Sequence, residues 1–343
     1  MKAVQLITPG QPLEIRDVEI PQLQSNDVLI AVKAAGVCHS DAHYRAGGLS
    51  ESKLPLTLGH EISGIIEKVG SEVENFRVGD RACVHYLISC GKCKYCLMEK
   101  EQFCTSVKMI GNSADGGYAE YIRVPARSVF VLPEDIPFEQ GAIMMCSGST
   151  SFHALNKARL KKGETVAVFG IGGLGMAAIQ LAKSLGASEV YAVDINDEKL
   201  IKAEKFGAIK VDSSEVDPVD EIMRLTNNDG VDVALELIGL PKTMEQAVRS
   251  LGIFGRAAIV GISSKPIEVE TKSNLINKET EIIGVSDHLA TELPQLIKIV
   301  QEGKLNLDAA VSKRIPLDAD DINSELDRLD NFSGEDVRTV IIP

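Results

Sequence analysis

The sequence contains no tryptophan, and aromatic residues make up only 4% of its 343 residues. We therefore expect few aromatic side chains to line any binding pocket. Apolar runs are interrupted well before the length of about 18 residues that a transmembrane helix needs, which argues against a membrane span. The N-terminal stretch MKAVQLITPGQPLEI lacks the apolar segment and cleavage site of a signal peptide, so we expect a cytoplasmic protein.

Positive charge is also scarce: the chain has 36 Lys and Arg residues but 49 Asp and Glu residues, which gives a formal net charge of −13. Such a balance repels nucleic acid and anionic membranes, and we expect neither as a partner. Cysteine is infrequent and odd in number, with seven residues. A secreted disulfide framework needs pairs and is usually found in a much shorter chain. Grouped thiols in a reducing compartment instead favour metal binding.

Four of the seven cysteines lie in the segment CGKCKYCLMEKEQFC, as Cys90, Cys93, Cys96 and Cys104. Four thiolates can close a tetrahedral zinc site with no open position, so this spacing predicts a structural zinc. An iron–sulfur cluster is the main alternative, but a bacterial ferredoxin has three residues before its fourth cysteine and then a proline. Here seven residues precede the fourth cysteine and Thr105 follows it. Unmetallated thiols are a further alternative.

The pattern of predicted secondary structure changes near residue 150. Before that point, short strands are predicted at residues 27–38, 62–70 and 81–87, separated by Gly, Pro and Asp turns. After it, predicted strands alternate with predicted helices, beginning with a strand at 165–170 and a helix at 174–187. This alternation is typical of an α/β fold with a doubly wound parallel sheet.

A glycine-rich loop connects the first predicted strand and helix of this α/β region. The glycines of the G-x-G-x-x-G pattern are Gly170, Gly172 and Gly175, and Gly173 lies in the same loop. The first glycine permits a tight turn, the second lets the backbone approach a pyrophosphate, and the third lets helix and strand pack closely. Asp194 ends the next predicted strand, where an acid can bind the adenosine ribose and repel a 2′-phosphate. The pattern predicts NAD rather than NADP; a βα turn without a ligand is the alternative.

Three dispersed residues are candidate ligands of a second metal. Cys38, His60 and Cys146 together would leave one position open, which is the arrangement of a catalytic zinc, although each alone is equally well explained as a buried packing residue. Residue 64 is Gly64, so HEISG is not the HExxH motif of a zinc protease. The remaining cysteine, Cys83, is expected to be a buried packing residue.

Several ordered motifs resemble those of the zinc-dependent medium-chain alcohol dehydrogenases. They include GVCHSD, LGHEISGIIEKVGSEVENFRVGDRA, the four-cysteine segment, DGGYAEY, CSGST, the glycine loop with Asp194, and VRTVIIP. The resemblance covers nearly the whole chain. It implies a GroES-like β-barrel catalytic domain formed by residues 1–148 and 286–343, with a Rossmann NAD-binding domain at 149–285 inserted between them.

The resemblance also implies roles for residues around a catalytic zinc held by Cys38, His60 and Cys146. Glu61 would lie behind the metal, and Asp41 would orient the imidazole of His60. Ser40 would bind the substrate hydroxyl, and His43 would form the solvent end of a proton relay. A solvated surface imidazole is the alternative for His43, and a structural hydrogen-bond acceptor is the alternative for Glu61.

Further residues would contact the coenzyme by the same resemblance. Thr150 and Leu174 would pack beside the nicotinamide, and Lys199 would touch the adenosine ribose. His39 and Arg338 would face the pyrophosphate. Because many members carry Arg where this chain has His39, the contact there would be weaker; for Arg338 a surface charge is the alternative.

The resemblance implies an oxidoreductase that uses NAD and two zinc ions per chain to oxidise a primary or secondary alcohol reversibly, and a homo-oligomer, a tetramer rather than a dimer. A polyol, threonine or sugar dehydrogenase of the same superfamily is an alternative, but those relatives often have Glu where this chain has Cys146. Zinc-free quinone and enoyl reductases lack the cysteines. A non-enzymatic NAD-binding scaffold protein is the remaining alternative.

Overall fold

The computed structural model describes residues 1–48, 54–331 and 337–343, which divide into two compact units. Unit 1 comprises Met1–Cys146, Leu289–Gln301 and Leu307–Pro343. Unit 2 comprises Ser147–His288 and Glu302–Asn306. No helix in the described part of the chain has both the length and the apolar character needed to cross a membrane.

Unit 1 contains a seven-stranded sheet whose members come from both ends of the chain. Its strands are β3 (Asp27–Val37), β5 (Glu61–Val69), β6 (Arg81–Val84), β9 (Tyr121–Pro125), β10 (Val129–Val131), β17 (Val311–Pro316) and β18 (Arg338–Ile342). The order is β10-β6-β5-β3-β18-β17, and β9 pairs with β3 as well. All these pairs are antiparallel except β17 with β18.

Smaller sheets and short helices complete unit 1. The smaller sheets contain β1 (Lys2–Leu6), β2 (Glu14–Asp17) and β4 (Leu56–Thr57), and the pair β7 (Leu87–Ile88) and β8 (Lys108–Met109). The α-helices are α1 (His39–Arg45), α2 (Lys94–Leu97), α3 (Phe138–Ile143), α9 (Leu293–Gln301) and α10 (Ala319–Asp330). Short turns of helix are η1 (Glu101–Phe103), η2 (Ala126–Ser128), η5 (Ala290–Glu292) and η6 (Asp308–Ala310), and η3 (Met144–Gly148) ends in unit 2.

The central strand of unit 1 is β3, which pairs with β5, β9 and β18. Nearly all of its residues are buried, as its largely apolar sequence DVLIAVKAAGV predicts for a strand covered on both faces. Ile30 packs in one core with Ile62 and Ile66 of β5 and Ile341 of β18. The strands predicted at residues 27–38, 62–70 and 81–87 are confirmed as β3, β5 and β6.

Unit 2 is a doubly wound parallel sheet. Its strands are β11 (Val166–Phe169), β12 (Val190–Asp194), β13 (Ile209–Asp212), β14 (Val231–Glu236), β15 (Leu251–Ile259) and β16 (Glu281–Gly284). The strand order β13-β12-β11-β14-β15-β16 is that of a dinucleotide-binding sheet, and every pair is parallel. The predicted alternation of strands and helices is therefore confirmed.

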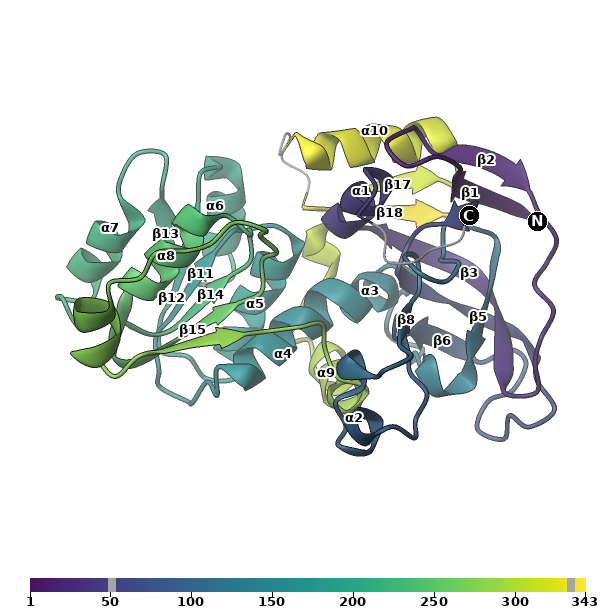
Figure 1. Cartoon of the computed structure of the whole chain (residues 1–343), viewed down its shortest axis with the longest axis horizontal. Coiled ribbons are helices and arrows are strands. Elements are labelled where there is room, and N and C mark those ends of the chain that lie inside the picture. The colour runs from purple at the N-terminus through teal and green to yellow at the C-terminus, as the bar shows by residue number, and fades with distance from the viewer. Residues whose placement is uncertain (49–53, 332–336) are drawn as a thin grey trace. The chain divides into compact units, whose positions relative to one another are not determined.

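Helices connect the strands of unit 2, as Figure 1 shows for its green and teal segments. They are α5 (Gly173–Ser184), α6 (Asp197–Glu204), α7 (Pro218–Leu225), α8 (Pro241–Arg249) and the π-helical turn η4 (Thr271–Ile276), while α4 (Ser149–Lys157) precedes the first strand, β11. The sequence marks where several of them start. Asp217 accepts hydrogen bonds from two free backbone N–H groups at the start of α7, and Pro218 occupies the first helical position, where its missing N–H costs nothing.

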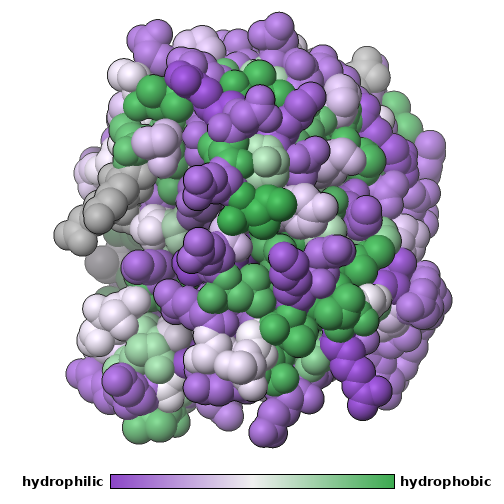
Figure 2. All heavy atoms as spheres, turned by 90° about the vertical axis from the view of Figure 1, so that its right-hand side faces the viewer, coloured by the Kyte–Doolittle hydropathy of each residue, from purple (hydrophilic) through white to green (hydrophobic). Residues whose placement is uncertain are grey.

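The surface of unit 1 is mixed in character. Figure 2 shows apolar side chains in several groups among polar ones on the face turned toward the viewer. Exposed large apolar residues of this unit include Ile15, Ile20 and Val78. Scattered exposed apolar side chains are normal for a folded protein and indicate no binding surface by themselves.

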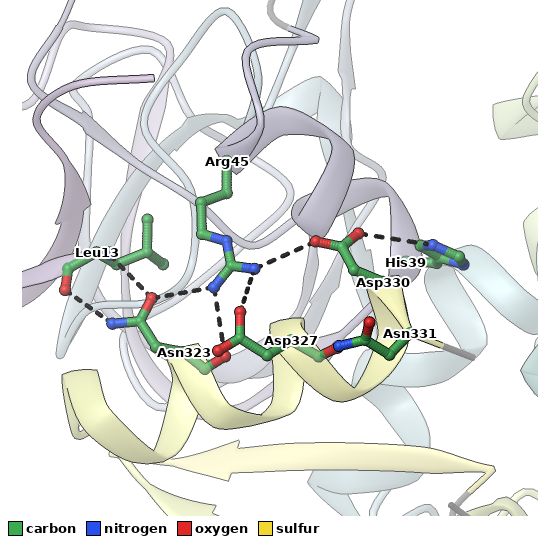
Figure 3. Close-up of polar contacts among 7 residues, drawn as sticks. All are labelled: Leu13, His39, Arg45, Asn323, Asp327, Asp330 and Asn331. Carbon is green, nitrogen blue, oxygen red and sulfur yellow. Dashed lines mark hydrogen bonds and ion pairs between the residues drawn. The ribbon is translucent and has the colours of Figure 1, made fainter. Parts of the chain in front are cut away.

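Helix α10 is joined to the N-terminal region by one asparagine. The Asn323 side chain accepts a hydrogen bond from the Leu13 backbone N–H and donates one to the Leu13 carbonyl, both at 2.9 Å. Figure 3 shows Arg45 of α1 reaching the same helix, where it binds Asp327 and Asp330. Because Leu13 is buried, its N–H group has no easy access to water if Asn323 is lost.

We expect Asn323→Ala to lower the free energy of unfolding by about 1–3 kcal/mol, because it leaves a buried backbone donor unsatisfied. Asn331→Ala is the matched control, because Asn331 donates to the Asp327 carbonyl at an exposed position, and its effect is expected to stay within about 0.5 kcal/mol. Urea unfolding followed by circular dichroism measures both. Equal midpoints for the two variants would contradict a role of Asn323 in stability.

Candidate active site

Strand register brings candidate metal ligands together at one end of β3. Gly36 of β3 lies opposite Glu61 of β5 and opposite Val340 of β18. Cys38 comes directly after β3, and His60 comes directly before β5. Because antiparallel neighbours run in opposite directions, the end of one strand lies beside the start of the other. Residues more than twenty positions apart in the sequence therefore become neighbours.

The side chains of Cys38, His60 and Cys146 converge in the interior of unit 1. The sulfur of Cys146, in η3, lies 4.0 Å from the Cys38 sulfur and 3.4 Å from Nε2 of His60. A tetrahedral zinc, with bonds of about 2.3 Å to sulfur and about 2.0–2.1 Å to nitrogen, places two sulfurs about 3.8 Å apart and a sulfur and a nitrogen about 3.5 Å apart. Both separations lie close to these values, and the ligand atoms of all three residues lie within 4.8 Å of one another, so the donors fit one zinc ion.

Asp41 holds the imidazole of His60 in place. This buried carboxylate lies 3.1 Å from Nδ1 of His60 and accepts hydrogen bonds from the Cys38 N–H and the Tyr118 hydroxyl, both at 2.9 Å. An Nδ1–H that donates to Asp41 leaves Nε2 directed at Cys146, as in many metal-bound histidines. Burial opposes protonation of His60, but the Asp41 carboxylate outweighs it and raises the pKa of His60 well above its usual value.

A buried ion pair lies directly beside these donors. Nη2 of Arg338 is 2.9 Å from Oε1 of Glu61, and Nη1 of Arg338 donates to the Val37 carbonyl. Burial raises the pKa of Glu61 to about 7, although the Arg338 guanidinium acts in the opposite direction. A Cβ atom at Gly36 would lie 1.9 Å from Oε2 of Glu61, so only glycine leaves room for this carboxylate.

The two thiols influence each other's ionisation. A hydrogen bond from Cys146 lowers the pKa of Cys38 well below its usual value, and the positive charges of Arg338 and His60 act in the same direction, while burial opposes them. The same interaction raises the pKa of Cys146. The thiolate is the form that binds metal, and the lowered pKa of Cys38 favours this form.

Three further predicted site residues lie on α1. Oγ of Ser40 is 3.9 Å from the Cys38 sulfur, so this hydroxyl adjoins the group of donors. His43 is exposed, and its ring stacks on that of His39 with centroids 4.6 Å apart. Burial, together with the charge of His43, lowers the pKa of His39. The helix therefore places Ser40 and Asp41 beside the donors, while the imidazoles of His39 and His43 are more exposed.

The four cysteines of the predicted structural site form a second group in unit 1. The ligand atoms of Cys90, Cys93, Cys96 and Cys104 all lie within 4.8 Å of one another. The sulfurs of Cys93 and Cys96 are 3.6 Å apart, and backbone N–H groups point at those of Cys90 and Cys104. Backbone hydrogen bonds lower the pKa of Cys93 to about 6. This all-sulfur group fits zinc and has no open position.

In unit 2 the glycine loop joins β11 to α5 at the carboxyl end of the sheet. Gly170 has φ +94°, which only glycine adopts readily, and a Cβ at Gly175 would lie 2.0 Å from the Gly170 carbonyl oxygen. A Cβ at Gly172 would meet nothing within 4 Å, so the backbone there is open to a ligand. Asp194, at the end of β12, accepts a hydrogen bond from the Ile171 N–H at 2.6 Å. The loop and the acid thus form one cradle.

The other predicted coenzyme residues of unit 2 lie on the helices α4, α5 and α6. Gly173 and Leu174 open α5, and the Leu174 carbonyl accepts a hydrogen bond from Ser151. Thr150 is buried in α4. The backbone N–H of Lys199, in the first turn of α6, donates to the side chain of Asn196.

Sequence reasoning did not identify every polar contact of the site. Tyr118 lies in DGGYAEY, one of the motifs behind the resemblance, but nothing in that motif indicates that its hydroxyl reaches Asp41. Nε2 of the buried His85 lies 3.6 Å from Oε1 of Glu101, a contact that no motif in the sequence indicates. Cys83 is buried, as expected. Contacts between distant segments leave no pattern in a single sequence.

Comparison with known proteins identifies the class of protein to which this site belongs. Residues 24–134 match the alcohol dehydrogenase GroES-like domain, and residues 173–302 match the zinc-binding dehydrogenase domain. The chain is 34% identical to the NAD-dependent alcohol dehydrogenase of Sulfurisphaera tokodaii, with both chains fully covered. It is 36% identical to an alcohol dehydrogenase of Geobacillus stearothermophilus, with 96% of each covered.

A solved structure, the alcohol dehydrogenase of Aeropyrum pernix, superposes with a TM-score of 0.90 at 36% identity, with full coverage of both chains. The fold and the donor groups define a zinc-binding dehydrogenase of mixed α/β architecture. The chain belongs to the zinc-dependent medium-chain alcohol dehydrogenase family. The predicted fold class, a GroES-like domain with a Rossmann-type sheet, is confirmed.

We expect Asp41→Asn to weaken zinc retention by about 10- to 100-fold, the usual loss when the outer partner of a metal-bound histidine is changed. Asn has a similar shape but no negative charge for His60. Zinc release to a chromophoric chelator measures the effect. Tyr118→Phe removes a single hydrogen bond to Asp41 and should cause a smaller loss. Wild-type retention in Asp41→Asn would show that Asp41 does not support the metal.

Proposed function

We propose that the protein is an NAD-dependent alcohol dehydrogenase that reversibly oxidises a primary or secondary alcohol to an aldehyde or ketone. The observation that carries this proposal is the convergence of the donor atoms of Cys38, His60 and Cys146 in the interior of unit 1. Three protein ligands leave a fourth coordination position for the substrate oxygen, as in catalytic zinc sites. Membership of the family supports the same function.

The proposal assigns two zinc ions to each chain. Cys38, His60 and Cys146 would hold the catalytic ion, which when bound supplies Lewis-acid polarisation of the substrate oxygen. The second ion would be held by the four clustered cysteines and would fasten a segment that has little apolar content of its own. Those four ligands are Cys90, Cys93, Cys96 and Cys104.

Side chains around the donors would position the substrate and move its proton. Ser40 Oγ would accept a hydrogen bond from the substrate hydroxyl, since it lies beside Cys38. The exposed imidazole of His43 would exchange the proton with water. Asp41 would keep Nε2 of His60 directed at the metal. Glu61, whose pKa lies near neutrality, would be able to change charge behind the donors while Arg338 compensates it.

The coenzyme would be bound mainly by the glycine loop of unit 2. The open backbone at Gly172 would admit the pyrophosphate, as would the neighbouring residues Gly170, Gly173 and Gly175. NAD supplies the hydride acceptor, and the protein supplies position and charge. Asp194 would bind the adenosine ribose diol and exclude a 2′-phosphate.

Other residues are assigned to the coenzyme on the strength of the family resemblance. Thr150 and Leu174 would lie beside the nicotinamide, and Lys199 beside the adenosine ribose. His39 and Arg338 would face the pyrophosphate. Arg338 is buried and paired with Glu61, so its charge would have to serve both the carboxylate and the phosphates.

The remaining parts of the proposal concern organisation and setting. Residues 1–148 and 286–343 would form the catalytic domain and 149–285 the NAD-binding domain. The protein would be cytoplasmic and a homo-oligomer, a tetramer rather than a dimer, acting on a small alcohol or carbonyl compound without a nucleic acid or membrane partner. The alternatives are a polyol, threonine or sugar dehydrogenase and an NAD-binding scaffold protein, and a panel of alcohols with NAD separates them.

We expect Cys146→Ser to reduce NAD-linked oxidation of ethanol or benzyl alcohol by about a thousandfold or more. Metal polarisation lowers the barrier by several kcal/mol, and about 1.4 kcal/mol corresponds to a factor of ten in rate. The NADH absorbance measures turnover, and elemental analysis should find one zinc fewer per chain.

Cys83→Ser is the matched control for that experiment. Cys83 is equally buried but belongs to neither group of donors, so its replacement should leave the zinc content unchanged. Undiminished turnover in Cys146→Ser would overturn the catalytic role of the metal. A wild-type protein that oxidises no alcohol in the panel would favour the scaffold alternative.

We expect Asp194→Asn to reduce kcat/KM for NAD by about 10- to 100-fold, because hydrogen bonds to a charged group contribute about 1.5–3 kcal/mol. Activity with NADP should rise at the same time, since the charge that repels a 2′-phosphate is gone. Asp197→Asn is the control, because Asp197 lies exposed at the start of α6 and binds Lys210. An unchanged ratio of NAD to NADP activity would contradict the role of Asp194.

A further inference from the structure

A third group of possible metal ligands lies outside the two groups assigned above. It consists of His39, His43 and Asp330, whose ligand atoms all lie within 4.8 Å of one another. This limit also holds within each of the two groups assigned to zinc. All three residues belong to unit 1, and their side chains are partly or fully exposed.

The two imidazoles come from one helix. His39 and His43 are four residues apart on α1, a spacing that places side chains on the same face of a helix. Their rings stack with centroids 4.6 Å apart and an angle of 15° between the planes. Two histidines at this spacing are a recurrent zinc-binding arrangement on helices.

The third donor comes from the end of α10. Oδ1 of Asp330 lies 3.9 Å from Nε2 of His39. Figure 3 shows Asp330 directed from α10 toward His39, with Arg45 on its other side. The other carboxylate oxygen, Oδ2, accepts a hydrogen bond from Arg45 at 3.2 Å.

Arg45 therefore fixes the carboxylate without using the oxygen that faces His39. Its guanidinium is largely buried and also binds Asp327 at 2.6 Å, so it is held on two sides. Preorganised donors lose less conformational freedom when a ligand binds, which favours a specific site over chance contact.

We infer that His39, His43 and Asp330 form a third metal site, which binds a divalent transition cation such as Zn²⁺. Two imidazoles and one carboxylate are a donor set that zinc uses, with water in the remaining position. Zinc bonds of about 2.0–2.2 Å require tetrahedral donor atoms about 3.3 Å apart. Closing the observed separation of 3.9 Å requires the two imidazoles to rotate out of their stacked arrangement, so that one nitrogen of each faces the ion.

Occupation of this site would have a functional consequence, which rests on the proposed function. His39 is assigned to the coenzyme pyrophosphate and His43 to proton release. A cation bound to both imidazoles would withdraw them from these roles. Zinc in excess of the two assigned ions would therefore inhibit turnover.

Binding of Zn²⁺ alone tests the site without depending on activity. The full-length, zinc-loaded protein is dialysed against micromolar Zn²⁺, and bound zinc is counted per chain against the same protein washed with a weak chelator. The wild type should gain one zinc. Asp330→Asn and His43→Gln should each weaken this binding by at least about tenfold, since even the loss of an outer partner of a metal ligand costs about 10- to 100-fold.

Asp327→Asn is the matched control, because Asp327 shares the contact with Arg45 but is not among the three donors. It should bind the additional zinc like the wild type. No additional zinc in the wild type, or equal uptake by Asp330→Asn and His43→Gln, would overturn the site.

Activity at increasing zinc concentration then tests the consequence separately. Zinc should inhibit the wild type and Asp327→Asn at the concentration at which the additional ion binds, and Asp330→Asn should resist. If the ion binds but turnover is unchanged, the site is supported and the assignment of His39 and His43 to the reaction is overturned. If no alcohol is oxidised at all, the proposed function fails while the binding measurement still decides the site.

Discussion

The pairing of β3 with two of its antiparallel neighbours, β5 and β18, is the constraint on which the candidate active site depends. β5 on one side delivers His60 and Glu61, and β18 on the other delivers Arg338. Gly36 is the residue where the two registers meet, and its missing side chain leaves the space that the Glu61 carboxylate occupies. A slip of either strand by one residue would turn the buried side chains to the opposite face and separate the donors.

Charge balance in this interior explains why so many ionisable groups tolerate burial. Isolated buried charges cost several kcal/mol each, so they need partners. Asp41 lies against His60, and Glu61 lies against Arg338. The thiols of Cys38 and Cys146 lie beside these pairs, where a bound divalent metal would add further positive charge. The protein part of the site is thus complementary to a positive ion.

Prediction from sequence succeeded where the information is local. The alternation of strands and helices and the glycine loop define the parallel sheet of unit 2, because each βα unit carries its own pattern. The spacing of Cys90 to Cys104 likewise confines four thiols to one segment, and they lie together. Cys38, His60 and Cys146 have no local pattern; they were grouped by the kind of ligand each offers, and the family resemblance supported the grouping. The approach of Tyr118 to Asp41 and of Asp330 to His39 depends on tertiary packing, which no single stretch encodes.

The contact between Arg338 and the Val37 carbonyl spans 301 positions of the chain, and that between Asn323 and Leu13 spans 310. Closing long loops costs more conformational entropy than closing short ones, and chains with many contacts between distant positions fold more slowly. During synthesis, the segment that forms unit 2 leaves the ribosome before β18 does, so its sheet can assemble while β3 still lacks one neighbour. The nascent chain is therefore expected to form the parallel sheet of unit 2 first, and to complete the surroundings of the donors at Cys38, His60 and Cys146 only once the last strand has docked.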